Sequence, residues 1–233
     1  MTTASTRGQT TLAFSPHPDD VEFGMGGTLL ALRDAGVDVH VIVVTDGAGL
    51  ASASASERYA EQELASGVGG YKSHYIGLQD GAVDVTSHNV EVFRDLVVGL
   101  SPTVVFAPFP FREATDFRSS HPDHENTGLL VREALLRARV PDSSGRYWRT
   151  DALYYYYLPS GVRPALAVDV SKVMEELPRL LQCFKSQTSR PKRSVDNLMA
   201  KRKANQVGME GVPSELFAAE GPLLAGVTQL FRT

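Results

Sequence analysis

Short apolar runs and stretches with helical periodicity alternate along the first 139 residues of the chain. Buried strands are predicted at residues 11–15, 39–44, 73–78 and 103–107. Helices are predicted at residues 26–35, 56–66, 89–100 and 125–139. Ser56 is the expected N-cap of the second of these helices. The alternation of strand and helix predicts an α/β fold, with a Rossmann-like, mostly parallel sheet, helices on both faces and right-handed crossovers.

The last third of the chain is less regular. Its expected elements are two strands and two helices, at residues 153–158, 165–170, 171–186 and 194–207. Pro178 is expected to bend or interrupt the first of these helices, and Ser194 is expected to cap the second. Residues 223–231 are expected to form either a further strand or a cover over the rest of the molecule.

Length and composition are those of one globular domain. The chain has 233 residues, of which 42% are hydrophobic, so it can bury a sizeable core. We expect one domain over residues 11–233, preceded by a flexible polar N-terminus at residues 1–10. The net charge of -4 gives no basic surface for nucleic acid and no attraction to an acidic membrane. No apolar run is long enough for a membrane span, and the N-terminus lacks an apolar signal segment, so a cytoplasmic location is expected.

Two His-Pro-Asp turns carry the candidate chemistry. The first is His17-Pro18-Asp19-Asp20, which follows the first predicted strand, and the second is His121-Pro122-Asp123-His124, which follows the fourth. Each turn opens a helix, and the carboxyl ends of parallel strands are where ligands bind in open α/β sheets. The chain has a single cysteine, Cys183, so a metal would be held by histidine and carboxylate side chains.

These residue types match a catalytic zinc site, which needs three protein ligands and an open position for water. His17, Asp20 and His124 would supply the ligands if the first and fourth strands are neighbours, as in the strand order 3-2-1-4. Asp19 lies beside a ligand and suits the general base. His121 is placed to stabilise the oxyanion or to protonate the leaving amine.

Other interpretations of the same residues remain open. An Asp-Asp pair before a helix commonly caps the helix, and a His-Pro pair is commonly only a turn. The joint pattern favours a metal site, because four potential ligands at one sheet edge are costly to leave unpaired. Two histidines and one carboxylate also match the facial triad of non-haem iron oxygenases, although an unligated Asp19 favours hydrolysis. A non-catalytic module that binds a sugar or a metal is the alternative from another class.

The two turns resemble the motifs of the LmbE-like, or PIG-L, superfamily of zinc-dependent N-deacetylases. The similarity lies in residues 16–22, 24–28 and 121–124, and it covers the chain up to about Arg139. It implies a hydrolase that removes the acetyl group from an N-acetylated amino sugar of the N-acetylglucosamine type, or from its conjugate. The implied metal is zinc, with Fe²⁺ or another divalent ion as an alternative. The implied ligands, base and electrostatic or acid partner are the residues already named.

The resemblance also implies roles for three further residues. Asp123 would orient His121, and Arg58 and Asp80 would bind sugar hydroxyls. Two positions depart from the family pattern: Ala48 replaces a glutamate, and Ser119 replaces a tyrosine that helps to polarise the amide in some members. A different amide, such as a mycothiol-type conjugate or an antibiotic intermediate, would use the same ligand set.

The expected partner is a small N-acetylated molecule, and a homo-oligomer is left open. Specificity is expected in three loops, at residues 48–56, 108–120 and 141–149. Asp116 and Arg118 lie in the second of these loops and have no assigned role. The run Tyr154–Tyr157 has alternate rings on opposite faces of a strand, so packing in the core is favoured over stacking on a sugar.

Overall fold

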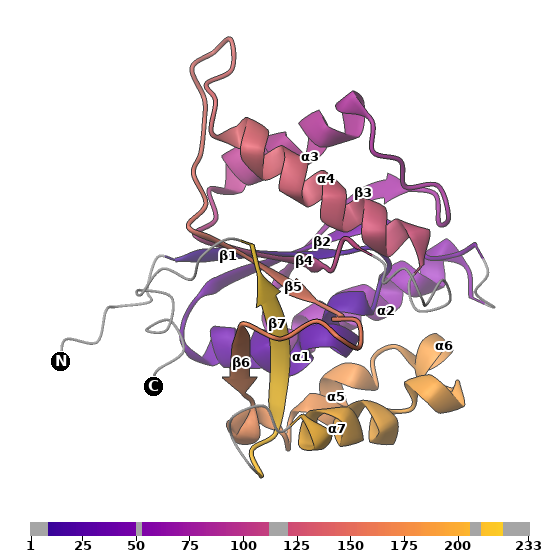
Figure 1. Cartoon of the computed structure of the whole chain (residues 1–233). Helices are drawn as coiled ribbons and strands as arrows, with labels where there is room; N and C mark the ends of the chain where they lie inside the picture. Colours follow the sequence, from indigo (N-terminus) through magenta and orange to yellow (C-terminus); the bar gives the residue numbers. More distant parts are fainter. Residues whose placement is uncertain (1–8, 50–52, 112–120, 206–210, 221–233) are drawn as a thin grey trace, which may run out of the picture.

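Seven strands form one sheet, and helices cover both of its faces (Figure 1). The computed structural model describes residues 9–49, 53–111, 121–205 and 211–220. Within them, the strand order is β3-β2-β1-β4-β5-β7-β6. The strands are β1 (Thr10–Ser15), β2 (Asp38–Thr45), β3 (Lys72–Leu78), β4 (Val104–Pro108), β5 (Ala152–Tyr156), β6 (Leu166–Asp169) and β7 (Ser214–Ala219).

The sheet is parallel from β3 to β5, and β7 runs antiparallel to both β5 and β6. On β1, Leu12 lies opposite His40 of β2 on one side and Val105 of β4 on the other. The predicted strand order 3-2-1-4 is therefore confirmed. The chain leaves β1 toward β2 and later returns to β4, so the topological switch point falls between β1 and β4.

The helices are divided between the two faces of the sheet (Figure 1). The α-helices are α1 (Asp20–Asp34), α2 (Ala55–Gly69), α3 (Ser87–Leu100), α4 (Pro122–Ala138), α5 (Leu177–Leu181), α6 (Lys185–Thr188) and α7 (Val195–Ala204). Two 3-10 turns accompany the last three helices: η1 (Ser171–Val173) lies before α5, and η2 (Pro191–Arg193) lies between α6 and α7. Helices α3 and α4 cover one face, and α1, α2, α5 and α7 lie on the other (Figure 1).

Two hydrophobic cores form because successive strand residues point to opposite faces. Ala13 of β1 and Val41 of β2 belong to the core beneath α1. Leu12 and Phe14 belong to the core beneath α3 and α4, where the Phe14 ring stacks on Phe93 with centroids 5.1 Å apart. Burial on both faces explains why the central strands are nearly continuous apolar runs.

Two helices begin three or more residues earlier than predicted. Helix α1 begins at Asp20 rather than residue 26, and it contains a kink at Met25 (φ -147°, ψ 28°). The glycines that indicated a helix start therefore mark the second segment of a kinked helix. Helix α4 begins at Pro122 rather than residue 125, with His121 as its N-cap. Both turns thus place their last residue, Asp20 or His124, inside the first turn of a helix.

The kink in α1 is stabilised by a residue from the last strand. Glu215 of β7 accepts hydrogen bonds from the backbone N–H groups of Gly27 and Thr28, at 3.0 and 2.7 Å. It also accepts a hydrogen bond from Nε of Arg202 at 2.6 Å, and both side chains of this ion pair are buried. A carboxylate suits this place, because the N–H groups after a kink are those of a new helix start.

The last third differs most from the prediction. The helix expected at residues 171–186 consists of η1, α5 and part of α6. Pro178 lies in the first turn of α5, which begins at Leu177, so the expected interruption is confirmed. Strand β7 was not predicted. The cap of α2 is Ser54, which accepts from the N–H of Glu57, and not Ser56. The predicted cap Ser194 of α7 is confirmed.

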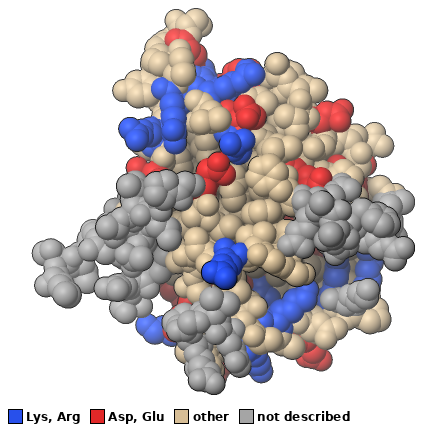
Figure 2. Space-filling model, viewed as in Figure 1, with Lys and Arg blue, Asp and Glu red and all other residues tan. Residues whose placement is uncertain are grey.

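The remaining expectations concern the chain ends and the surface. Residues 1–8 of the expected flexible N-terminus and all of residues 223–231 lie outside the described residues, whereas Thr10 begins β1. Figure 2 shows acidic and basic side chains interspersed on one face of the molecule. Among the described helices, none has both the length and the apolar character needed to cross a bilayer.

Candidate metal centre

The first turn is fixed by the side chain that ends β1. The hydroxyl of Ser15 donates to the carbonyl of His17 at 2.7 Å and accepts from the N–H of Val21 at 3.2 Å. Asp19 then adopts a left-handed conformation (φ 113°, ψ -25°), which costs on the order of 1–3 kcal/mol for a non-glycine residue. Its side chain makes no capping hydrogen bond to α1. The interpretation of Asp19 as a simple helix cap is therefore wrong.

One carboxylate oxygen joins the two turns. Oδ2 of Asp20 lies 2.8 Å from Nδ1 of His17 and 3.0 Å from Nε2 of His124, which comes from the first turn of α4. Candidate ligand atoms of all three residues lie within 4.8 Å of one another. The adjacency of β1 and β4 brings these residues together across 107 positions of sequence, as residues 17 and 124 show.

The donor set fits a divalent metal ion. Two imidazole nitrogens and a carboxylate oxygen are ligands that zinc accepts. The other ring nitrogen of His17, Nε2, lies 3.1 Å from Oδ1 of Asp80 and 3.4 Å from Oδ2 of Asp123. Carboxylates on the far nitrogen of a histidine fix its tautomer and leave the near nitrogen as a ligand.

The charges around His17 also call for a cation. Burial lowers the pKa of His17, but hydrogen bonds to Asp123, Asp20 and Asp80 outweigh burial and raise the pKa to about 12. Either a proton on this ring or a divalent ion beside it would offset the negative charge of these three carboxylates. His17, Asp80, His121 and Asp123 form a second group of potential ligands, which shares His17 with the first.

Asp19 lies beside the ligand triad and is fully buried. Its Oδ2 accepts from Nη1 of Arg58 and from Nη1 of Arg193, each at 3.2 Å. Its Oδ1 has no hydrogen-bond partner among the described residues. Burial and the charge of Asp20 raise the pKa of Asp19 to about 6, although both arginines act to lower it. A buried carboxylate with one open oxygen and a pKa near neutrality suits a general base.

His121 is the N-cap of α4, and its side chain is 39% exposed. Its Nδ1 accepts from the N–H of Asp123 at 3.3 Å, so the neutral ring carries its proton on Nε2. Burial and the charge of His17 lower the pKa of His121. The His121 ring meets the His17 ring edge-on, with centroids 5.0 Å apart.

Asp123 lies between the two histidines. Its carboxylate accepts from the N–H groups of Gly81 and Val83, at 2.7 and 3.3 Å. The nearest His121 nitrogen is 3.9 Å away, whereas Nε2 of His17 is 3.4 Å away. The predicted contact with His121 is thus longer than the contact with His17.

The two residues expected to bind sugar hydroxyls make hydrogen bonds to other residues of the site. Arg58 of α2 is buried and donates to Asp19 and, at 2.5 Å, to the carbonyl of Pro18. Asp80 follows β3, contacts His17 and accepts from the N–H of Gly49 at 3.0 Å. Its side chain is 13% exposed, against 3% for Arg58.

Sequence reasoning missed two residues that reach the site. The ring of Tyr157 stacks on His124, with centroids 5.5 Å apart and planes 17° apart, and Arg193 contacts Asp19. The prediction that the tyrosine run packs in the core is confirmed for Tyr154, Tyr155 and Tyr156, which are buried. Tyr157 is 38% exposed and has a positive φ of 57°, so its ring leaves the strand alternation.

Three residues of interest, Asp116, Arg118 and Ser119, lie outside the described residues.

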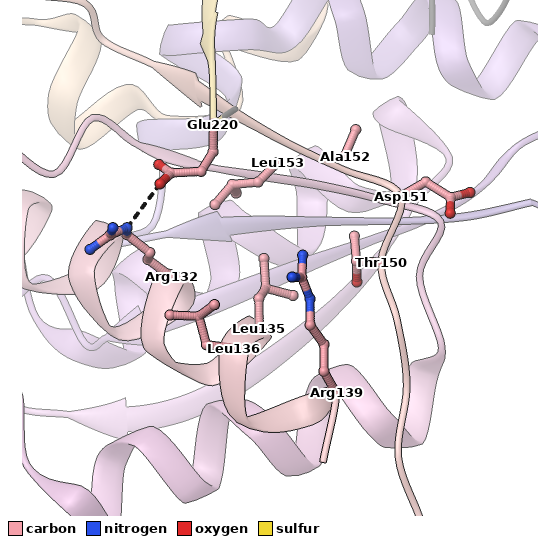
Figure 3. A pocket seen from close by; sticks show the side chains of 9 residues that line it. All are labelled: Arg132, Leu135, Leu136, Arg139, Thr150, Asp151, Ala152, Leu153 and Glu220. Carbon is pink, nitrogen blue, oxygen red and sulfur yellow. Dashed lines mark hydrogen bonds and ion pairs between the residues drawn. The ribbon is translucent and has the colours of Figure 1, made fainter. Parts of the chain in front are cut away.

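A separate cavity of about 120 Å³ lies at the other end of α4 (Figure 3). It is lined by Leu135 of α4, by Arg139 just after that helix, by Leu153 at the start of β5 and by Glu220, which pairs with Arg132 at 3.0 Å. None of the predicted site residues lines this cavity. It belongs to the amino end of β5, whereas the candidate metal centre is at the carboxyl ends of β1 and β4.

Two comparisons of the sequence with known proteins give its family. The family described as PIG-L, GlcNAc-PI de-N-acetylase, matches residues 12–135. The diacetylchitobiose deacetylase of Thermococcus kodakarensis is 30% identical over 198 residues, which is 76% of this chain and 69% of that protein.

Two solved structures have the same fold over most of both chains. A conserved protein of Thermus thermophilus superposes with a TM-score of 0.81 and 25% identity, over 92% of this chain and 96% of the other. The N,N'-diacetylchitobiose deacetylase of Pyrococcus horikoshii superposes with a TM-score of 0.78 and 26% identity, over 91% of this chain and 84% of the other.

Proposed function

Because the chain belongs to the PIG-L, or LmbE-like, family, we propose that it is a metal-dependent N-deacetylase of an N-acetylated amino sugar of the N-acetylglucosamine type, or of its conjugate. One observation carries the proposal: Oδ2 of Asp20 lies within 3.0 Å of nitrogens of both His17 and His124. Beside it is Oδ1 of Asp19, which has no hydrogen-bond partner among the described residues. Two similar proteins are named as deacetylases of diacetylchitobiose, which supports an amino-sugar substrate.

His17, Asp20 and His124 are the proposed metal ligands. A divalent ion held there would act as a Lewis acid toward the acetyl carbonyl and lower the pKa of a water toward ~7. We propose zinc, while the same donor atoms also suit iron. A cytoplasmic location and a possible homo-oligomer stay predictions.

The chain's own residues would carry the proton transfers. Oδ1 of Asp19 takes a proton from the attacking water, and a C–O bond forms at the acetyl carbon. His121 stabilises the oxyanion through the proton on its Nε2. The proton that Asp19 took from the water then passes to the leaving nitrogen. The C–N bond breaks, and the products are acetate and a free amine.

The surrounding residues have supporting roles in this proposal. Asp80 and Asp123 hold His17 through its Nε2, and Asp123 also lies near enough to His121 to restrict its ring. Arg58 fixes Asp19 and closes the turn at Pro18. Contact with sugar hydroxyls stays a prediction for Arg58 and Asp80, and the greater exposure of Asp80 favours it there.

The test is release of acetate from N,N'-diacetylchitobiose and N-acetylglucosamine, with the metal content of the protein measured by elemental analysis. Replacing Asp19 by Ala should lower kcat by about 10²-fold or more and leave the metal content unchanged, because only the base is removed. Arg190→Ala, on an exposed residue away from the ligands, is the matched control.

Two outcomes would contradict the proposal. Near-normal turnover of the Asp19→Ala variant would exclude Asp19 as the base. Bound metal without acetate release from any acetylated sugar or from other amides would favour a binding module instead of an enzyme.

A further inference from the structure

The irregular last third of the chain is attached to the first turn of α1. Helix α7 carries the buried Arg202, whose Nη2 donates to the backbone carbonyls of Glu22 and Phe23 at 3.3 and 3.1 Å. The same guanidinium pairs with Glu215, which holds the kink of α1. These buried contacts fix the last turn of α7 against the first turn of α1.

Arg193, in the 3-10 turn just before α7, reaches the general base. Its Nη1 donates to Oδ2 of Asp19 at 3.2 Å, and its guanidinium lies 5.9 Å from the ring centroid of Phe23. Ser194 caps α7 by accepting from the N–H of Asn197, which fixes the backbone next to Arg193. Among the described residues, Arg193 is the only one after β6 with a hydrogen bond to Asp19.

Two guanidinium groups therefore bind the same oxygen of Asp19 from different elements. Arg58 approaches from α2 with a side chain that is 3% exposed, and Arg193 approaches from η2 with one that is 39% exposed. Both donate to Oδ2, and Oδ1 is buried without a hydrogen-bond partner in the part of the chain that the structure describes. A carboxylate held at one oxygen by two donors cannot rotate to exchange its oxygens without breaking both hydrogen bonds.

From this geometry we infer that Arg193 is a positioning residue for Asp19. Together with Arg58 it holds Oδ2, so that Oδ1 stays available to the attacking water. The inference rests on the proposed function, in which Asp19 is the base. It also gives the last third of the chain a part in catalysis, because the position of Arg193 depends on the anchoring of α7 by Arg202.

A double-mutant cycle tests whether Arg193 acts through Asp19. Arg193→Ala should lower kcat for acetate release about tenfold or more, with KM within about twofold and the metal content unchanged. In the Asp19→Ala background, the same substitution should have no further effect on kcat, since the residue through which it acts is gone. Arg193→Lys should restore at least half of the lost activity on a logarithmic scale, because lysine can still donate to Oδ2.

The cycle has a second readout that does not need activity. The urea unfolding midpoint is measured for Arg193→Ala, for Asp19→Ala and for the double variant. The losses of the two single variants should not add up to the loss of the double variant, because the two side chains contact each other. Arg190→Ala is the control, since Arg190 is exposed and lies three residues before Arg193. It should leave kcat and the midpoint unchanged.

Three results would overturn the inference. A raised KM with unchanged kcat would make Arg193 a substrate-binding residue. An equal loss of kcat in the Asp19→Ala background would show that Arg193 acts independently of the base. Full activity of Arg193→Ala, beside an inactive Asp19→Ala variant, would leave the proposed function standing and remove the inference alone.

Discussion

The first two thirds of the molecule and the last third contribute to the site in different ways. The strand-turn-helix units of the first region supply the candidate ligands, each in the segment between a central strand and the first turn of the next helix. The last region supplies no candidate ligand among its described residues. Its Glu215 and Arg202 make hydrogen bonds to the backbone of α1, and its Arg193 makes one to Asp19. One region thus provides the reacting groups, and the other restricts their positions.

The largest effect is expected where the two turns meet. Replacing Asp20 by Ala removes the oxygen that contacts both His17 and His124, so the protein should lose its metal and its deacetylase activity together. Elemental analysis and acetate release measure the two losses on one preparation. The wild type treated with a chelator should match the variant in activity and should recover when metal is added back. If the Asp20→Ala variant kept both its metal and its activity, Asp20 would not be a metal ligand.

A large effect on stability is expected in the last region. Replacing Glu215 by Gln leaves the buried Arg202 without its charge partner and weakens the cap of the α1 kink. The free energy of unfolding should fall by about 3–5 kcal/mol, the usual cost of breaking a buried ion pair at one partner. Urea unfolding gives the value.

The matched control for this prediction is Glu176→Gln. Glu176 pairs with Arg33 of α1 at 2.7 Å, but the pair is partly exposed, with side chains 34% and 25% accessible. The expected loss is within about 1 kcal/mol, because solvent screens such pairs. Equal losses in the two variants would show that Glu215 has no special part in joining the regions.

The smallest effect is expected at the β2–β3 edge, which belongs to the first region but lies away from the ligands. His40 and His74 stack there, with Nδ1 of His40 2.8 Å from Nε2 of His74, and Asp38 and Lys72 flank them. Burial and the charges of His40 and Lys72 lower the pKa of His74. Because the folded pKa lies below the unfolded one, this group lowers stability as the pH falls through about 6.5 toward the folded value.

Replacing His74 by Gln should therefore reduce the loss of stability on acidification, with little change at pH 8. Thermal unfolding of the variant and the wild type at pH 8 and pH 5.5 measures the difference, and acetate release at pH 8 should be the same for both. A drop in deacetylase activity at pH 8 would show that this edge is coupled to the site after all.

Much of the fold and of the candidate ligand set could be predicted from local patterns. The apolar runs of β1 to β4 and the helical periodicity between them indicated a parallel sheet, and the structure has it. The position of both His-Pro-Asp turns after central strands indicated that His17, Asp20 and His124 would meet, because neighbouring parallel strands end at one edge. Helix starts were misplaced because glycines in α1 mark a kink and not an N-terminus.

The parts that could not be predicted depend on contacts between distant segments. Nothing in the residues around Arg193 indicates a contact with Asp19, 174 positions away, and the short strand β7 has no strong periodicity. The hydrogen bonds of Asp80 and Arg58 to residues of the first turn could not be predicted either, because they depend on how β3 and α2 pack beside that turn.

The sequence by itself therefore determined the parallel part of the sheet, its switch point and the residue types that a metal would need, because each follows from the pattern of one strand, one turn and one helix. Only the tertiary structure decided which oxygen of Asp19 stays open and which residues hold it. Such hydrogen bonds require the last third of the chain to be fixed against α1, and that fixing comes from the buried contacts of Arg202 and Glu215.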